Sequence, residues 1–218
     1  MRINKYIAQA TGFSRRAVDT MIDECTITVN GAVAVRGQEV DESDQVVVNG
    51  KLVTPQSSLT ILVNKPFGYV CSKNGQGSKT IYELLPEKYQ HLKTVGRLDK
   101  NSSGIILLTS DGDLAYELTH PSKVKLKRYE IALDRPLQPL HQQIIQEPGV
   151  QLEDGLSRLR LAKLDDDGIK WEVVMHEGRN RQIRRTFESL GYSVMKLHRT
   201  NFGNYKLGEL KSGHIKEI

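Results

Sequence analysis

The chain has 218 residues, of which 38% are hydrophobic and 26% are charged, and it carries a formal net charge of +5. These values are typical of a soluble globular protein with one large domain or two smaller ones. The longest apolar runs, such as the IILL of residues 105–108, are too short to cross a membrane, and no signal-peptide pattern is visible at the N-terminus. We therefore expect a cytoplasmic protein.

The thiol and imidazole groups form no metal-binding pattern. Cys25 and Cys71 are not part of a CxxC motif, and the six histidines lack the spacing of zinc ligands. We therefore expect ordinary thiols, no disulfide and no metal site. A phosphate-binding loop is excluded as well, because GQGSKT at residues 75–80 lacks the Gly-Lys-Ser/Thr ending at the required spacing.

Positive charge gathers in three segments. Residues 1–16 contain four lysines and arginines and no acid, residues 123–128 read KVKLKR, and residues 179–199 hold six lysines and arginines against one acid. Any one of these clusters could be an ordinary solvated surface. The three together favour binding to a nucleic-acid backbone.

Residues 1–53 are expected to form a small unit of their own. Apolar residues at helical spacing predict a first helix that ends at Gly12, and Ser14 is a favourable N-cap for a second helix. Two Asn-Gly pairs, at residues 30–31 and 49–50, each predict a tight turn between short strands. The proline and small polar residues of TPQSS, residues 54–58, indicate a linker.

Residues 59–218 mix strands and helices without a regular strand–helix–strand repeat. We therefore expect a second, larger domain of the α+β class with a mixed, mainly antiparallel sheet. The expected strands are residues 60–64, 105–109, 125–133, 156–164, 169–175 and 194–197. The expected helices are residues 80–85, 111–119, 140–146 and 181–190.

Three segments of this larger domain contain side chains suited to catalysis, although each pattern is weak alone. Asp99 follows Arg97 in a polar turn before a buried strand, where a carboxylate is more often a cap than a catalyst. Tyr129 lies in a strand, where an aromatic side chain commonly packs half-buried. Arg184 lies one helical turn from Glu188, with which it could form an ordinary ion pair.

Taken together, these segments resemble the RsuA/RluB-type ribosomal RNA pseudouridine synthases. The matching sequences are NKPFGYVCS at 64–72, VGRLDKNSSGIILLTSDGDLAYELTHPS at 95–122, KRYEI at 127–131, GVQLEDG at 149–155, EGRNRQIRR at 177–185 and KLHR at 196–199. The N-terminal unit resembles the alpha-L RNA-binding module, which is named after ribosomal protein S4. With this module included, the resemblance covers nearly the whole chain.

The resemblance implies an isomerase that converts uridine to pseudouridine within ribosomal RNA and needs no cofactor. Asp99 matches the catalytic carboxylate, Arg184 matches the arginine that keeps it ionised, and Tyr129 matches the aromatic residue that stacks on the target uracil. Leu197 matches the apolar cover of the pocket. Arg97 matches the residue that fills the gap left by the flipped nucleotide.

The resemblance also implies how RNA is held. The helix pair of the N-terminal module presents basic side chains to RNA, and a helix N-terminus with adjacent arginines attracts phosphate by dipole and by charge. The expected partner is ribosomal RNA or a pre-ribosomal particle, and we expect a monomer because one chain can hold the complete site. The expected RNA-binding residues are Lys5, Ser14, Arg15, Arg16, Arg179, Arg181 and Arg185.

Two other functions stay open at this point. A non-catalytic RNA-binding factor of ribosome assembly would keep the fold without turnover, although the presence of Asp99, Tyr129, Arg184 and Leu197 argues against it. A nucleic-acid glycosylase would release free base, which a dry pocket closed around uracil disfavours. The KLHR and THPS motifs are shared too widely in the family to distinguish large-subunit from small-subunit RNA, and we expect the large-subunit RNA. The motifs also leave open whether Asp99 attacks the sugar or takes a proton from it.

Overall fold

The computed structural model describes residues 1–55, 57–120 and 122–218. The chain divides into two compact units. The first comprises Met1–Thr60, His91–Lys93 and Thr109–Asp111, and the second comprises Ile61–Gln90, Thr94–Leu108 and Gly112–Ile218. The expected linker at 54–58 includes residue 56, and the THPS motif at 119–122 includes residue 121, so parts of both lie outside the described residues.

The first unit begins with two short helices, α1 (Ile3–Thr11) and α2 (Arg15–Asp23). Helix α1 ends as predicted at Gly12, which adopts a left-handed conformation with φ of 77° that favours glycine. Helix α2 begins as predicted at Ser14, because the Ser14 Oγ accepts a hydrogen bond of 3.1 Å from the Ala17 amide. Local signals in the sequence therefore correctly predicted the C-terminus of α1 and the N-terminus of α2.

A four-stranded antiparallel sheet completes the first unit, with strand order β2-β1-β3-β4. Asn30 and Gly31, and likewise Asn49 and Gly50, have positive φ angles, so the two predicted tight turns are confirmed. The strands are β1 (Ile27–Val29), β2 (Ala32–Val33), β3 (Val46–Val48) and β4 (Lys51–Leu52). The helices and the sheet bury a common core that includes Ile3, Ile7, Val18, Ile22, Ile27 and Val46.

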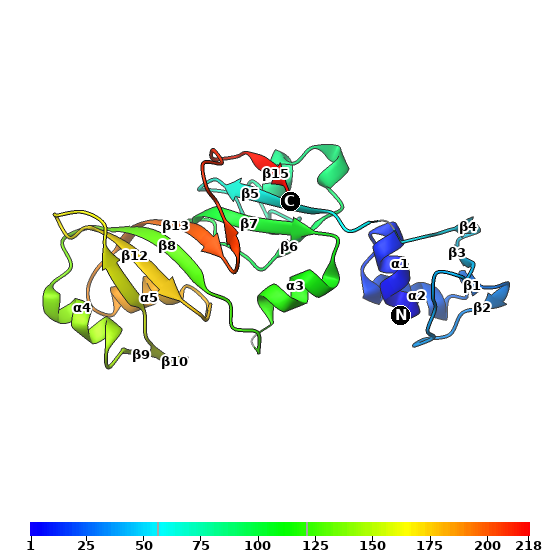
Figure 1. Cartoon of the computed structure of the whole chain (residues 1–218), viewed down its shortest axis with the longest axis horizontal. Helices are drawn as coiled ribbons and strands as arrows, with labels where there is room; N and C mark the ends of the chain where they lie inside the picture. Colours follow the sequence, from blue (N-terminus) through cyan, green and yellow to red (C-terminus); the bar gives the residue numbers. More distant parts are fainter. Residues whose placement is uncertain (56, 121) are drawn as a thin grey trace. The chain divides into compact units, whose positions relative to one another are not determined.

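The second unit is built on a nine-stranded sheet. Seven of its strands follow the order β11-β12-β8-β13-β7-β5-β15, and the other two, β14 and β6, pair with β13 and β7. Figure 1 shows β8, β13 and β7 as neighbouring strands. The strands are β5 (Thr60–Lys65), β6 (Lys93–Val95), β7 (Ser103–Thr109), β8 (Lys127–Leu133), β11 (Arg160–Lys163), β12 (Lys170–Met175), β13 (Val194–Phe202), β14 (Tyr205–Lys206) and β15 (Ile215–Glu217).

Short helices and a small separate hairpin surround this sheet. No helix in the described ranges is long and apolar enough to cross a membrane. The helices are α3 (Gly112–Thr119), α4 (Pro139–Gln146), α5 (Gln182–Glu188) and the 3-10 helices η1 (Ile81–Leu84) and η2 (Glu87–Tyr89). The hairpin consists of β9 (Val150–Leu152) and β10 (Gly155–Ser157), which pair with each other.

The α+β class and the mixed sheet agree with the sequence, but two predicted strands differ. The single strand expected at 156–164 is divided between β10 and β11, because Ser157 turns inward to hydrogen-bond Thr186 and Leu159 is buried. The strand expected at 194–197 continues to Phe202. Irregularities in the β8–β13 register let its last residues keep pairing with the start of β8.

Most recorded strand pairs are antiparallel, and β13 pairs with β7 in parallel. At this contact His198 is opposite Ser103, and Arg199 is opposite Gly104. Gly104 has a φ of +106°, and a Cβ atom added to it would lie 2.2 Å from the Arg199 carbonyl oxygen. Only glycine fits this close approach.

We expect Gly104→Ala to lower the free energy of unfolding by about 3 kcal/mol, because the methyl group meets backbone atoms and the positive φ adds strain. Chemical denaturation followed by circular dichroism measures this loss. Gly112→Ala is the matched control, since a Cβ there meets nothing within 4 Å. It should change stability by less than about 1 kcal/mol. Equal stability of the two variants would contradict the close approach.

Candidate active site

A cavity of about 310 Å³ opens in the second unit between the turn that precedes β7, strands β8 and β13, and the segment that leads into α5. Its walls come from segments far apart in the sequence that the sheet brings together. Six of the side chains expected to act in catalysis or RNA binding line it, namely Arg97, Asp99, Tyr129, Arg179, Arg181 and Leu197.

The turn that carries Asp99 is fixed by hydrogen bonds within the protein. The Cys71 thiol is 3.3 Å from both the amide nitrogen and the carbonyl oxygen of Leu98, whose side chain is buried. The Asp99 carbonyl oxygen accepts a bond of 3.0 Å from the Ser102 amide. The Asp99 side chain is half-buried at the cavity wall, and Arg97 is exposed. A carboxylate is thus held at a defined place beside a buried strand.

Tyr129 and Leu197 form part of the floor of the cavity. Both side chains are 8% exposed. Tyr129 lies on β8 directly opposite Arg199 of β13, and Leu197 lies opposite Ile131. The pleat of the two strands points Tyr129, Leu197 and Arg199 toward the same cavity. An aromatic ring and an aliphatic chain beside a carboxylate make a site suited to a flat ring whose faces pack against apolar side chains.

Arg184 contacts the backbone of the Asp99 turn. Its guanidinium donates to the carbonyl oxygens of Asn101, at 2.5 Å, and Val194. Burial lowers the pKa of Arg184, Arg181 lowers it further, and Asp99 raises it. An ion pair of Arg184 with Asp99, the carboxylate it is expected to keep ionised, is not among the ion pairs of the described residues. The two groups instead interact through space and through the turn backbone.

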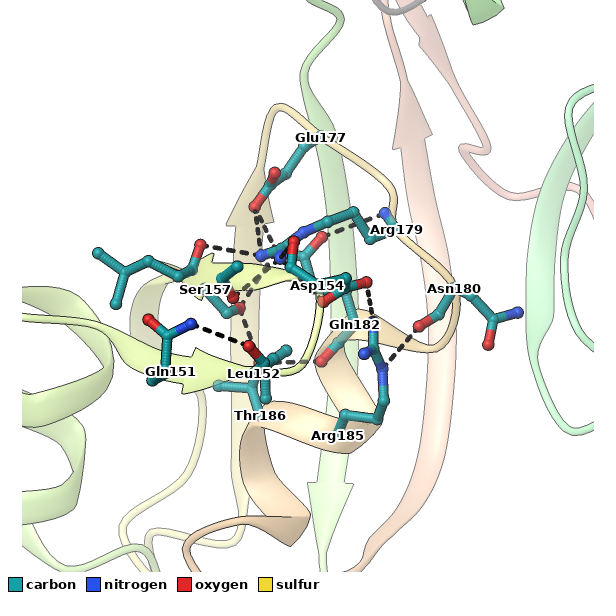
Figure 2. A network of polar contacts seen from close by, with 12 residues as sticks. Gln151, Leu152, Asp154, Ser157, Glu177, Arg179, Asn180, Gln182, Arg185 and Thr186 are labelled. Atoms are coloured by element: carbon teal, nitrogen blue, oxygen red, sulfur yellow. Dashed lines mark hydrogen bonds and ion pairs between the residues drawn. The ribbon is translucent and has the colours of Figure 1, made fainter.

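Arg179 and Arg185, both expected to bind RNA, are engaged within the protein by Asp154 (Figure 2). Arg179 is 3.0 Å from one Asp154 carboxylate oxygen, and Arg185 is 2.6 Å from the other. Arg179 also donates to the Asp154, Gly155 and Leu156 carbonyl oxygens. The hydrogen bond from Arg185 holds the pKa of Asp154 below its usual range. These arginines tie the β9–β10 turn to the cavity wall.

Arg181 differs from these neighbours. Its side chain is exposed at the cavity, and its backbone has a positive φ of 47° just before α5. No hydrogen bond or ion pair of its side chain is found among residues 1–55, 57–120 and 122–218. Of the three arginines, Arg181 is therefore the one whose charge is directed outward.

A second set of contacts fixes the start of α5 (Figure 2). The Gln182 amide donates to the Ser157 hydroxyl at 3.1 Å and to Glu177. Ser157 and Thr186 share a hydrogen bond of 2.7 Å. Glu177 and Gln182 belong to the motif at 177–185, whereas Ser157 and Thr186 lie outside the motifs. Only the folded chain shows these contacts, because Ser157 is 25 and 29 positions from Gln182 and Thr186 in the sequence.

Three further residues at or near the site were not predicted from the sequence. Lys65 is fully buried, and its ammonium donates to the Pro66 and Tyr69 carbonyl oxygens at 2.9 and 2.7 Å. Burial lowers the pKa of Lys65 to about 8, while Cys71 and Asp99 act against this shift. Arg199 is 3% exposed and lines the cavity. Lys65 and Cys71 lie in the NKPFGYVCS motif, but that motif alone gives them no role.

The basic residues of the first unit occupy ordinary surface positions. Arg15 donates to the Asn4 side chain at 3.2 Å, and Arg16 is exposed beside it at the start of α2. Lys5 is half-buried on α1. Within the described parts of both units, no group of three or more His, Cys, Asp or Glu side chains could hold a metal ion.

Comparison with known proteins identifies the class of this chain. Residues 59–189 match the family described as RNA pseudouridylate synthase. A Bacillus subtilis protein named ribosomal large subunit pseudouridine synthase B is 34% identical over 224 residues, which cover 100% of this chain and 91% of the relative. A solved structure entitled "Crystal structure of pseudouridylate synthase" is 27% identical, with a TM-score of 0.70 over 100% of this chain and 96% of that one.

An Aquifex aeolicus protein named as an uncharacterized RNA pseudouridine synthase is 35% identical over 231 residues, covering 100% of this chain and 90% of the relative. The chain belongs to the RNA pseudouridylate synthase family. It is an isomerase with the pseudouridine synthase fold, as its motifs predicted.

The lowered pKa of Lys65 predicts a pH-dependent stability. Between about pH 8 and the ordinary value of 10.5, folded Lys65 is neutral while unfolded Lys65 is still charged. The unfolded state then binds more protons, so stability rises with pH across this interval. Relative to Lys65→Met, the free energy of unfolding should rise by at most about 1.4 kcal/mol per pH unit.

Urea unfolding at several pH values between 7.5 and 10 measures this difference. Burial raises the pKa of Cys71, which gives the opposite slope above its ordinary value. Both proteins should therefore carry Cys71→Ala. Parallel pH profiles for the two would mean that Lys65 titrates normally in the folded chain.

Proposed function

We propose that this enzyme converts a uridine of large-subunit ribosomal RNA to pseudouridine, with Asp99 as the catalytic carboxylate. The observation that carries the proposal is the meeting of Asp99, Tyr129 and Leu197 at one cavity, although their positions in the chain are far apart. The substrate is inferred from relatives named ribosomal large subunit pseudouridine synthase B, such as the one from Bacillus subtilis.

The chemistry requires a carboxylate that stays ionised, a place for the base and exclusion of water. In the proposal Asp99 attacks the ribose or takes a proton from it, and Tyr129 stacks on the uracil. Leu197 keeps the cavity apolar, so the detached uracil is reused rather than lost to water. Arg97, which is exposed at the cavity wall, fills the gap that the flipped nucleotide leaves in the RNA.

Arg184 supports Asp99 in two ways in this proposal. Its positive charge favours the ionised carboxylate, because a desolvated carboxyl group otherwise becomes neutral. Its hydrogen bond to the Asn101 carbonyl oxygen holds the turn two residues beyond Asp99. Arginine suits this role, since it stays charged when partly buried and can hold two acceptors at once.

A path for RNA is supported by a second cavity of about 820 Å³ beside the first. The two cavities share Lys127, Gly178 and Arg179 in their walls. One acid, Glu177, is found among the lining residues, and it accepts hydrogen bonds from Arg179 and Gln182. The basic lining residues are Lys123, Lys127, Arg158, Arg160 and Arg179. Such a lining favours phosphates next to the target nucleotide.

The proposed organisation has an S4-like RNA-binding domain at residues 1–53, a linker at 54–58 and the catalytic domain at 59–218. Two short helices on a hairpin sheet support the first assignment, as do exposed arginines at the start of α2. We propose that Lys5, Ser14, Arg15 and Arg16 contact RNA there, that the enzyme acts as a cytoplasmic monomer and that it needs no cofactor.

Asp99→Asn should abolish pseudouridine formation while RNA affinity and thermal stability stay near those of the wild type. The amide keeps the shape of the side chain but removes its negative charge. Activity is measured as release of tritium from C5-labelled uridine in a large-subunit ribosomal RNA transcript, since the C5 hydrogen is lost in the reaction. Asp167→Asn, in an exposed turn, is the matched control. Full activity of Asp99→Asn would end the proposed mechanism.

Mapping of pseudouridine in ribosomal RNA from cells with and without this gene identifies the target nucleotide. A missing pseudouridine in large-subunit RNA is expected. A missing pseudouridine in small-subunit RNA would correct the substrate. Unchanged modification of all ribosomal RNA would favour an RNA-binding assembly factor without turnover.

The double variant Arg15→Ala with Arg16→Ala should bind the same transcript more weakly and with a flatter dependence on salt. Each lost phosphate contact reduces the slope of log affinity against log salt by roughly 0.7 to 0.9. Filter binding between low and moderate salt measures the slope. Lys51→Ala, also an exposed position of the first unit, is the control. An unaltered slope in the double variant would exclude α2 as a docking surface.

A further inference from the structure

The floor of the catalytic cavity contains a buried cation that the mechanism so far does not use. Arg199 on β13 is 3% exposed and lines the cavity. Its Nε donates to the Ile105 carbonyl oxygen at 2.9 Å. Its Nη2 is buried and has no hydrogen-bond partner in the described part of the chain. No carboxylate of that part forms an ion pair with it.

The surroundings hold this guanidinium in place without neutralising it. Its central carbon is 4.6 Å from the centre of the Phe202 ring, and the Lys127 ammonium is 5.9 Å from the same ring. Arg199 also contributes to lowering the pKa of Lys127, as expected for two nearby positive charges. Burying a cation without a carboxylate is costly for folding. The arrangement therefore suits a ligand that brings acceptor atoms or negative charge.

The proposed reaction produces such a ligand. When the bond between ribose C1′ and uracil N1 breaks, the electron pair stays on the base and spreads over its two carbonyl oxygens. Asp99 cannot stabilise this charge, because it is itself negative. A donor that is already in position costs no reorganisation when the charge appears. Arg199 lies opposite Tyr129, the residue proposed to stack on the same base.

We propose that the Arg199 guanidinium donates to a carbonyl oxygen of the target uracil and stabilises the negative charge on the detached base. This inference rests on the proposed function. Carbon 5 of the base then bonds to the ribose carbon, the C5 proton leaves and N1 regains a proton, so the product is an isomer of the substrate. Arg199 neither gains nor loses a proton in the cycle. It is thus a further catalytic residue beside Asp99.

A catalytic Arg199 predicts that its replacement lowers the reaction rate without lowering the Tm. A purely structural arginine predicts that the Tm falls. Replacing an unpaired buried charge by an apolar chain of similar length removes a cost of folding. Arg199→Met should therefore have a Tm equal to or above that of the wild type and unchanged RNA affinity. Its single-turnover rate of tritium release from the large-subunit transcript should fall by roughly 10² to 10³. Arg199→Lys, which keeps the charge, should lose less.

Arg135→Met is the matched control. Arg135 also lies over an aromatic ring, 4.8 Å from the centre of Tyr192, and donates to a backbone carbonyl oxygen, but it does not line the cavity. Its rate should stay at the wild-type value. A wild-type rate for Arg199→Met would overturn the inference. So would weaker RNA binding with a flatter salt slope at an unchanged rate, which would assign Arg199 to a phosphate.

A structural role would appear as a lower Tm for Arg199→Met, with the rate restored at low temperature, and this result too would overturn the inference. If Arg199→Met does not fold, the tritium-release rate of Arg199→Lys tests the inference instead. A wild-type rate together with a wild-type Tm for Arg199→Lys would mean that the guanidinium has no special role. Failure of the proposed function is distinct, because the wild-type protein itself would then release no tritium from any ribosomal RNA.

Discussion

The close parallel contact between β7 and β13 is the constraint on which the site depends. Gly104 lets the backbone of β7 approach Arg199 more closely than any residue with a Cβ atom could. Through this contact the turn that carries Asp99 lies close to β13, which carries Leu197. The strand on the other side of β13 is β8, which carries Tyr129. A carboxylate from the first half of the chain thus meets an aromatic ring and an aliphatic side chain from the second half.

The side chains that line the cavity carry more positive than negative charge. One carboxylate, Asp99, is found among its described lining residues, together with several cations. Arg179 is neutralised by Asp154 and Glu177, so it acts as part of the framework. Arg181 is exposed, whereas Arg199 is buried at the cavity. Three arginines of one basic segment thus differ in burial and in partners, and these differences are the basis of the separate roles proposed for them.

Local signals predicted the parts of the fold that local physics controls. Gly12, Ser14 and the Asn-Gly turns could be read directly, because a left-handed residue or a cap depends on its neighbours in the chain. Family motifs indicated Asp99 and Tyr129, which do lie at one cavity. The contact of Arg184 with Asn101 and the role of Asp154 could not be predicted, since both depend on tertiary pairing between distant segments.

The shared carboxylate of Asp154 limits how this enzyme can change over evolutionary time. One acid serves two arginines, one on each oxygen, and both arginines belong to the segment that forms the cavity wall and α5. Loss of that acid would leave Arg185 without its counter-ion and Arg179 with Glu177 alone. Relatives that lack it are therefore expected to have altered the Arg185 position as well, so that these two sites should vary together, whereas Arg179 can be retained.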